Sequence, residues 1–241
     1  MFFSTNFRIG LSLLNKSIYI SNKSLLGLLQ DIAEMHSSTV GFGVTDIEKT
    51  HFTWALLNWK VEIFNRPKYG DIIKINTWSS HSEKLYCFRD FEILNSNNEL
   101  IGIATSKWVL INAETKKICK ITNDLMSKYE PEEKSVFNTF DLPKLEELSE
   151  YSDSINYAIR KSDIDVNEHV NNLCYLDMAY EILPYNLAFN TECNNFEILY
   201  KKQIKFNDNI KTFYGQNEKG EHFVVIKNVD TNILHSIMKF W

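Results

Sequence analysis

One arrangement of secondary-structure patterns occurs twice in this sequence: a helical segment followed by a series of strand-like segments. In the first copy, apolar residues recur at helical spacing between Ser24, the expected N-cap, and Gly43. This apolar stripe consists of Leu25, Leu28, Leu29, Ile32 and Met35. After the helix, β-branched and aromatic residues take up a period of two over residues 54–64, 71–80, 86–94 and 100–112. The pattern predicts a helix followed by an antiparallel meander.

The second copy repeats this order with shorter connections. A helical stripe runs from Leu173 to Leu183 and ends at Pro184, which cannot continue a helix. Strand-like segments follow at residues 196–206, 210–216, 221–229 and 232–241. The expected fold class is therefore α+β, built from two helix-plus-sheet units. Since a single unit would expose an edge strand, we expect the two units to pair edge to edge into one continuous sheet, with a binding site between them.

An acidic segment separates the two copies. Residues 123–149 contain two prolines and no sustained apolar stripe. We interpret this segment as a linker that is helical around Leu145 to Leu148. It would connect an N-terminal unit at residues 1–122 with a C-terminal unit at residues 150–241.

Composition and charge argue against several classes of protein. The net charge of −5, with lysines interspersed among acids, does not favour a nucleic-acid binder, which needs a concentrated basic face. We expect neither export nor membrane insertion, because the sequence shows no basic leader and no apolar run of about 18 residues. The cysteines are scattered and the histidines lack partners at ligand spacing, so we expect no metal site, no disulfide framework and a cytoplasmic location.

Hydrogen-bonding residues crowd the segment SDIDVNEHVNNLCY, residues 162–175, which precedes the second helix. Asp165, Asn167 and His169 alternate there, and in an extended segment residues two apart point to the same side. They would converge beside a helix N-terminus, whose free N–H groups can polarise a carbonyl oxygen. Without an obvious serine or cysteine nucleophile, the attacking species would be water, activated by His169 or Asp165. The alternative interpretation is that these residues only form turns and caps.

The D-x-N-x-H-V-N-N element at residues 165–172 resembles the signature of the acyl-ACP thioesterase family. Weaker similarities follow the family's order in residues 28–43, 52–78 and 88–112. The resemblance implies a tandem (double) hotdog fold and hydrolysis of fatty acyl thioesters of acyl carrier protein. It places the catalytic aspartate, asparagine and histidine at Asp165, Asn167 and His169. The family's functional glutamate is replaced by Gln203, which can orient water but cannot accept a proton at neutral pH.

The substrate would need an apolar tunnel for the acyl chain and a polar mouth for the thioester. We expect the N-terminal unit to enclose the chain. The expected lining residues are Leu29, Ile32, Met35, Phe42, Trp54 and Trp59. The expected partner is an acyl carrier protein, whose acidic surface could contact Lys201, Lys202, Lys205, Arg160 or Lys161. We expect no cofactor, and a homodimer is possible but not required.

Two other functions stay open on the sequence alone. The fold supports several chemistries, so the protein could hydrolyse acyl-CoA or hydrate an enoyl thioester. Because Gln203 replaces the glutamate, it could also be a weakly active acyl-binding protein. Comparison of carrier-linked with CoA-linked thioesters, and the Gln203→Glu variant, would separate these functions.

Overall fold

The computed structural model describes residues 1–139, 142, 144–189 and 193–241. The strands of the N-terminal half are β1 (Phe3–Arg8), β2 (Phe52–Ile63), β3 (Ile72–Ser82), β4 (Cys87–Leu94), β5 (Leu100–Asn112) and β6 (Ile118–Cys119). Its helical segments are η1 (Leu11–Leu13), α1 (Asn22–Thr39), η2 (Val44–Asp46) and α2 (Ile47–Thr50). The structure confirms the strands predicted for this half and adds β1 and β6.

The C-terminal half repeats this order. Its strands are β7 (Asp153–Tyr157), β8 (Asn195–Tyr200), β9 (Ile210–Gln216), β10 (His222–Asn228) and β11 (Leu234–Phe240). Its helical segments are η3 (Lys161–Asp163), α4 (Cys174–Tyr180) and α5 (Tyr185–Phe189), and α3 (Asn123–Lys128) lies in the linker. The strand predicted for residues 196–206 ends at Tyr200, and the segment after it runs in a loop past α4.

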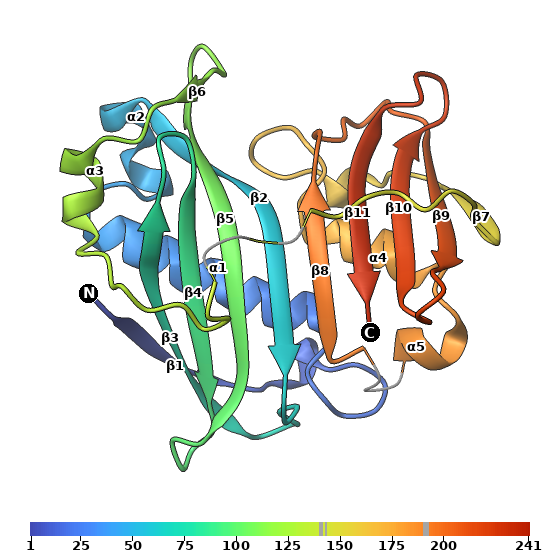
Figure 1. Cartoon of the computed structure of the whole chain (residues 1–241), viewed down its shortest axis with the longest axis horizontal. Helices are drawn as coiled ribbons and strands as arrows, with labels where there is room; N and C mark the ends of the chain where they lie inside the picture. Colours follow the sequence, from blue (N-terminus) through green and yellow to red (C-terminus); the bar gives the residue numbers. More distant parts are fainter. Residues whose placement is uncertain (140–141, 143, 190–192) are drawn as a thin grey trace.

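All strands belong to one antiparallel sheet with the order β1-β3-β4-β5-β2-β8-β11-β10-β9-β7, and β6 pairs with β5 (Figure 1). The two halves join where β2 pairs with β8, with Asn58 opposite Leu199 and Glu62 opposite Asn195. From this junction outward, the strands of each half follow one another in the same order. The structure therefore confirms the predicted duplication and the continuous sheet.

Helix α1 differs from its prediction at both ends. Its N-cap is Ser21, whose hydroxyl accepts a hydrogen bond from the N–H of Ser24 at 3.0 Å, so the predicted cap at Ser24 is wrong. Met35 is also wrongly placed on the buried stripe, because its side chain is 42% exposed. The fully buried position beside it is His36, which lies four residues after Ile32 and therefore on the same helix face.

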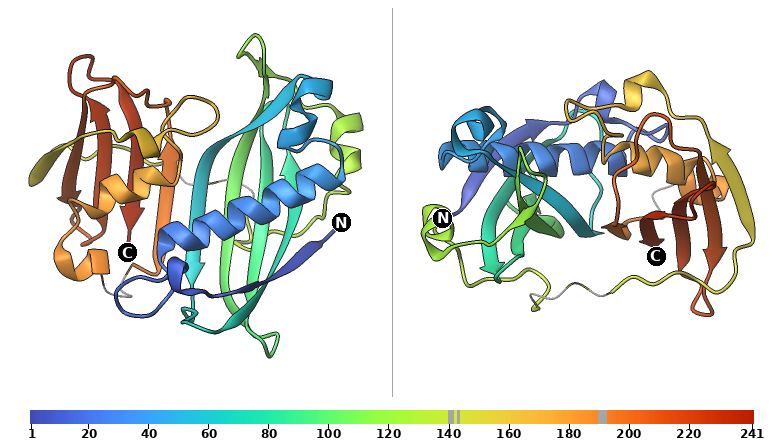
Figure 2. Two further views of the ribbon diagram at one scale, coloured as in Figure 1. Left: turned by 180° about the vertical axis from the view of Figure 1, so that it is seen from behind. Right: turned by 90° about the horizontal axis from the view of Figure 1, so that it is seen from above.

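The helices cover one face of the sheet and the linker crosses the other (Figure 2). The Trp78 indole donates to the carbonyl of Lys134 at 2.9 Å, and Leu145 packs against Phe223 and Val225. Residues 144–150 are described and contain no helix, so the helix expected around Leu145 to Leu148 is wrong. Packing against β10 and β11 holds this segment instead.

Asp90 is buried on β4, on the opposite face from its neighbour Arg89. Burial raises the pKa of its carboxyl to about 6, and the hydroxyls of Thr105 and Ser80 only partly oppose this shift. The pKa of this carboxyl is therefore higher in the folded protein, about 6, than in the unfolded chain, near 4. Such a group stabilises the folded state fully below pH 4, and this contribution is lost as the pH rises through 6.

We expect Asp90→Asn to remove this pH dependence. The free energy of unfolding of the variant, minus that of the parent, should rise by about 2 kcal/mol between pH 4 and pH 7, since each pKa unit corresponds to about 1.4 kcal/mol and part of the change lies below pH 4. Urea unfolding across this range measures the difference. A difference independent of pH would show that the pKa of Asp90 is not raised in the folded protein.

Candidate active site

Residues 165–169 form a tight hairpin that precedes α4. The N–H of Asp165 donates to the carbonyl of His169 at 2.8 Å, and Glu168 adopts the left-handed conformation with φ of 62°. The carboxylate Oδ1 of Asp165 accepts from the N–H of Asn167 at 2.8 Å and from that of His169 at 3.4 Å. The expected extended segment is therefore wrong. The turn places Asp165 opposite His169, with Asn167 near its tip.

The N-terminal half contains the same hairpin at residues 15–19. Asn15 takes the place of Asp165, and its side-chain oxygen accepts from the N–H of Ser17 at 2.9 Å and that of Tyr19 at 3.2 Å. Ile18 has a φ of 63°, and the N–H of Asn15 donates to the carbonyl of Tyr19. The backbone is thus a repeated scaffold. An aspartate and a histidine occupy the paired positions only in the C-terminal copy.

The hairpin leaves its functional groups accessible to different degrees. Asp165 and His169 are half-buried, whereas Asn167 is exposed. Within the described residues, the buried Nδ1 of His169 has no hydrogen-bond partner. A half-buried imidazole with an unpartnered nitrogen, on the same turn as a carboxylate, supplies groups that can accept and return a proton.

The loop after β8 brings Gln203 beside this hairpin. The N–H of Val170 donates to the carbonyl of Ile204 at 2.9 Å, which ties the two segments together. The buried Tyr175 hydroxyl of α4 accepts from the N–H of Ile204 at 3.2 Å and donates to the carbonyl of Lys202 at 3.5 Å. Burial raises the pKa of this phenol, so it stays protonated. Gln203 itself is exposed.

We expect Tyr175→Phe to loosen this loop. The variant leaves the buried N–H of Ile204 without its partner, which should lower the free energy of unfolding by about 1–3 kcal/mol. Thermal unfolding measures the loss. Tyr214→Phe is the control, because it removes a hydroxyl bonded to His222 on β9 and β10 and should leave turnover unchanged. An unfolding temperature of Tyr175→Phe equal to that of the parent would show that the loop does not need this hydroxyl.

The start of α4 lacks the free N–H groups expected there. The N–H of Leu173 donates to the side chain of Asn171 at 2.8 Å, and that of Cys174 donates to the Asn171 carbonyl at 2.9 Å. The N–H groups of Tyr175 and Leu176 are also bonded to carbonyls of the preceding turn. The expectation that these amides would polarise a substrate carbonyl is therefore wrong.

The residues expected to line an acyl tunnel occupy three environments. Leu29, Ile32 and Trp59 are buried in the main core, Phe42 and Trp54 pack against a second apolar cluster, and Met35 is largely exposed. On one face of β4, Arg89 lies between Phe91 of the main core and Cys87 of the second cluster.

The buried Arg89 belongs to a polar layer between these two clusters. Its guanidinium bonds to Nδ1 of His36 at 2.9 Å and to the hydroxyl of Thr77 at 3.2 Å. Burial, with the nearby charge of Arg89, lowers the pKa of His36 to about 3, so this imidazole is neutral at physiological pH. The predicted lining is thus interrupted by a buried cation.

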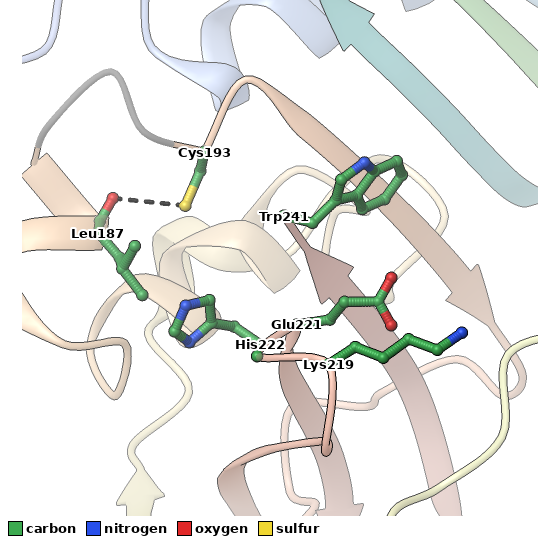
Figure 3. A pocket seen from close by; sticks show the side chains of 7 residues that line it. Leu187, Cys193, Lys219, Glu221, His222 and Trp241 are labelled. Atoms are coloured by element: carbon green, nitrogen blue, oxygen red, sulfur yellow. Dashed lines mark hydrogen bonds between the residues drawn. The ribbon is translucent and has the colours of Figure 1, made fainter.

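Two surface hollows lie away from the hairpin. One, of about 240 Å³, is shown in Figure 3. Its lining residues are Leu187, Cys193, Lys219, Gly220, Glu221, His222 and Trp241. The other, of about 180 Å³, includes Arg66 and Asp71. Neither is lined by the hairpin or by the expected tunnel residues.

Metal ligands and membrane-spanning helices are not found in the described residues. No group of three His, Cys, Asp or Glu side chains there could hold a metal ion. In the same part of the chain, no helix is long and apolar enough to cross a bilayer. No disulfide joins the cysteines of the described residues, Cys87, Cys119, Cys174 and Cys193.

Known structures share this architecture. An acyl-ACP thioesterase from Bacteroides thetaiotaomicron superimposes with a TM-score of 0.86 at 22% identity, covering 99% of this chain and 96% of the other. The fold is the double hotdog. The family model for the acyl-ACP thioesterase N-terminal domain matches residues 2–129, and that for the C-terminal domain matches residues 146–240. The chain belongs to the acyl-ACP thioesterase family, as the resemblance indicated.

Curated relatives agree with this assignment. Oleoyl-acyl carrier protein thioesterase 1 of Arabidopsis thaliana is 29% identical over 203 residues, which cover 77% of this chain and 56% of that protein. A palmitoyl-acyl carrier protein thioesterase of Gossypium hirsutum is 30% identical over 218 residues, covering 83% and 52%. The chain spans a little over half the length of these relatives.

Proposed function

We propose that the protein hydrolyses fatty acyl thioesters of acyl carrier protein. A water oxygen attacks the thioester carbon while its proton passes to His169, supported by the carboxylate of Asp165. The tetrahedral intermediate then collapses, the C–S bond breaks, and the departing thiolate takes the proton back. The products are a free fatty acid and the carrier thiol. The observation that carries this proposal is the hairpin that sets Asp165 opposite His169, with an unpartnered Nδ1 on His169.

Asn167 and Gln203, whose side chains are uncharged, form hydrogen bonds in this scheme and do not transfer protons. Asn167 is exposed near the hairpin tip, where its carboxamide can bond the pantetheine arm or the thioester. Gln203 is held beside the hairpin by the Val170–Ile204 hydrogen bond and can orient water without accepting its proton. The base is therefore the Asp165–His169 pair.

The acyl chain is proposed to enter the N-terminal half between α1 and the sheet. Leu29, Ile32 and Trp59 would contact it first, because they form the apolar interior on this side of the polar layer. Phe42 and Trp54 lie in the cluster beyond Arg89. Met35 is left out of this lining because it is exposed. Leu29, Ile32 and Trp59 are themselves buried, so an acyl chain that enters between them must displace core side chains.

The proposal is tested by thiol release from a panel of acyl carrier thioesters of increasing chain length. We expect release with at least one chain length, and faster release from carrier-linked than from CoA-linked substrates. Release only from acyl-CoA would identify a CoA thioesterase, and no release from any thioester would end the proposal. A large gain on Gln203→Glu would instead support the weakly active acyl-binding protein.

The carrier is proposed to dock beside the loop after β8. Lys201, Lys202 and Lys205 are exposed there, and none of them forms an ion pair with another described residue. Arg160, in contrast, is committed to Asp163 and Asp177. Unpaired cations at the mouth of the site can attract an acidic carrier over a distance of about 8–10 Å at physiological salt.

Reversal of all three charges, Lys201→Glu, Lys202→Glu and Lys205→Glu, should raise KM for an acyl carrier thioester by at least about tenfold, because rim charges govern encounter. KM for the same acyl group on pantetheine should not change. The matched control reverses Lys116, Lys117 and Lys120, which are exposed on the β5–β6 hairpin and give the same net charge. Equal effects of the two triple variants would place the dock elsewhere.

We further propose a cytoplasmic location. Four cysteines that form no disulfide within the described residues fit a reducing compartment. The plant relatives carry the word chloroplastic in their names, so fractionation of the source cell decides between these compartments.

A further inference from the structure

The flank of α1 that faces the C-terminal half contains a glutamine with a buried, unpartnered amide. Gln30 is half-buried overall, but its Nε2 is fully buried and forms no hydrogen bond with the described residues. A buried N–H without a partner costs about 1–3 kcal/mol, so a glutamine kept in this state calls for a functional explanation.

The contacts between α1 and α4 show what this flank faces. The ammonium of Lys23 lies 2.6 Å from the carboxylate of Asp177, and a Cβ added at Gly27 would lie 3.6 Å from the side chain of Leu173. From the first contact to the second, the residue number rises along α1, from 23 to 27, and falls along α4 and its N-cap, from 177 to 173. The two helices therefore run antiparallel. Both helices lie on the same face of the sheet (Figure 2).

Gln30 continues this row of contacts. Lys23, Gly27 and Gln30 are spaced i, i+4 and i+7, which places them on one side of the helix. Gln30 lies one turn further along α1 than the Gly27–Leu173 contact, past the N-terminal end of α4, which the hairpin at residues 165–169 precedes in the chain. One turn further, Glu34 accepts from the N–H of Val44, so η2 closes the flank on the other side.

Two segments that reach the N-terminal end of α4 thus each contain a buried polar atom without a partner: Nε2 of Gln30 on α1, and Nδ1 of His169 in the chain that leads into α4. One belongs to the N-terminal half and the other to the proposed catalytic hairpin. A buried polar atom is normally satisfied by protein or by a bound molecule, and a thioester carbonyl with its attacking water supplies one acceptor and one donor. The first amides of α4 are already bonded and cannot serve that carbonyl.

We propose that Gln30 is a catalytic residue contributed by the N-terminal half, whose carboxamide Nε2 donates a hydrogen bond to the thioester carbonyl oxygen. This inference rests on the proposed thioester hydrolysis. The hydrogen bond from Gln30 strengthens as negative charge develops on the carbonyl oxygen in the tetrahedral intermediate, while His169 takes the proton of the attacking water. Each half then contributes one part of a single active site.

The variant Gln30→Met tests this assignment, because methionine keeps the length of the side chain and removes the amide. We expect kcat to fall about 10²- to 10³-fold, as on loss of an oxyanion donor, with KM changed by less than about threefold. The unfolding temperature should stay equal or rise, since an unsatisfied polar group is replaced by an apolar one. Gln216→Met, on an exposed glutamine of β9, should leave all three values unchanged.

A merely structural Gln30 would give the opposite result: a lower unfolding temperature with an unchanged kcat. That outcome, in a parent protein that releases thiol, overturns the role of Gln30 and leaves the proposed function standing. A parent that releases no thiol from any substrate defeats the proposed function itself.

A second measurement does not depend on turnover. The chain has three glutamines, so the side-chain amide signals of selectively ¹⁵N-labelled protein can be assigned with the Met variants. Titration with an amide-linked acyl-pantetheine analogue should shift the Gln30 signal and leave that of Gln216 in place. A bound analogue that leaves the Gln30 signal unmoved overturns the inference.

Discussion

Asp165→Asn should lower kcat/KM for an acyl carrier thioester by about 10²- to 10⁴-fold without unfolding the protein. The rate falls because the variant removes the carboxylate that supports proton transfer beside His169. The fold persists because asparagine offers the same side-chain oxygen to the hairpin, as Asn15 does in the N-terminal copy. Thiol release and thermal unfolding, measured on the same preparation, give both values.

The repeat supplies the control for this prediction. Asn15→Asp makes the reverse exchange in a hairpin of the same geometry and should leave both turnover and stability close to the parent. Asp165→Ala adds a second comparison, because it also removes the acceptor for the N–H of Asn167 and should cost about 0.5–2 kcal/mol. Full activity in Asp165→Asn would show that the proton is handled elsewhere.

His169→Ala should reduce kcat/KM by a similar factor, about 10²- to 10⁴-fold, because it removes the group that takes the proton from water. The side chain is half-buried and its Nδ1 bonds no described residue, so little stability should be lost. Tyr19→Ala, at the equivalent position of the N-terminal hairpin, tests whether the loss reflects chemistry rather than hairpin geometry. Comparable losses of activity in the two variants would favour a structural explanation.

Most of the fold could be predicted because it depends on long-range patterns in the sequence. The period of two over β2 to β5 and the helical stripe of α1 are strong signals, and their repetition indicates the continuous sheet. β1 and β7 were not predicted. Both are short edge strands with polar residues at most positions. In β1 the inner positions are only half-buried and one of them is Thr5, and in β7 the first four residues are exposed, so the apolar alternation in the sequence is weak.

The details of the site that were not predicted depend on local hydrogen bonds between side chains and the backbone. These bonds override the alternation of residues that would indicate an extended segment. Asp165 bends the segment by bonding its own backbone, which turns an apparent strand pattern into a hairpin. Asn171 uses up the amides at the start of α4 in the same way. The matching positions of Asn15 and Asp165, each four residues before the aromatic ring of Tyr19 or His169, were a signal that could have revealed this turn.

Gln30 could not be found from sequence patterns alone. On a helical wheel it is an ordinary polar residue at the edge of the apolar stripe of α1. Its position past the N-terminal end of α4 depends on how α1 packs against α4, which is a contact between segments more than 140 residues apart. Only the assembled structure brings the two halves of the site together.

A single turnover in H₂¹⁸O, with enzyme in excess over acyl carrier thioester, tests the central claim that water attacks the thioester directly at this hairpin. We predict that the fatty acid released in the first turnover contains ¹⁸O and that the peptide containing Asp165 does not. Unlabelled fatty acid together with ¹⁸O in the Asp165 carboxylate would show that a covalent acyl-enzyme forms, and would contradict the mechanism.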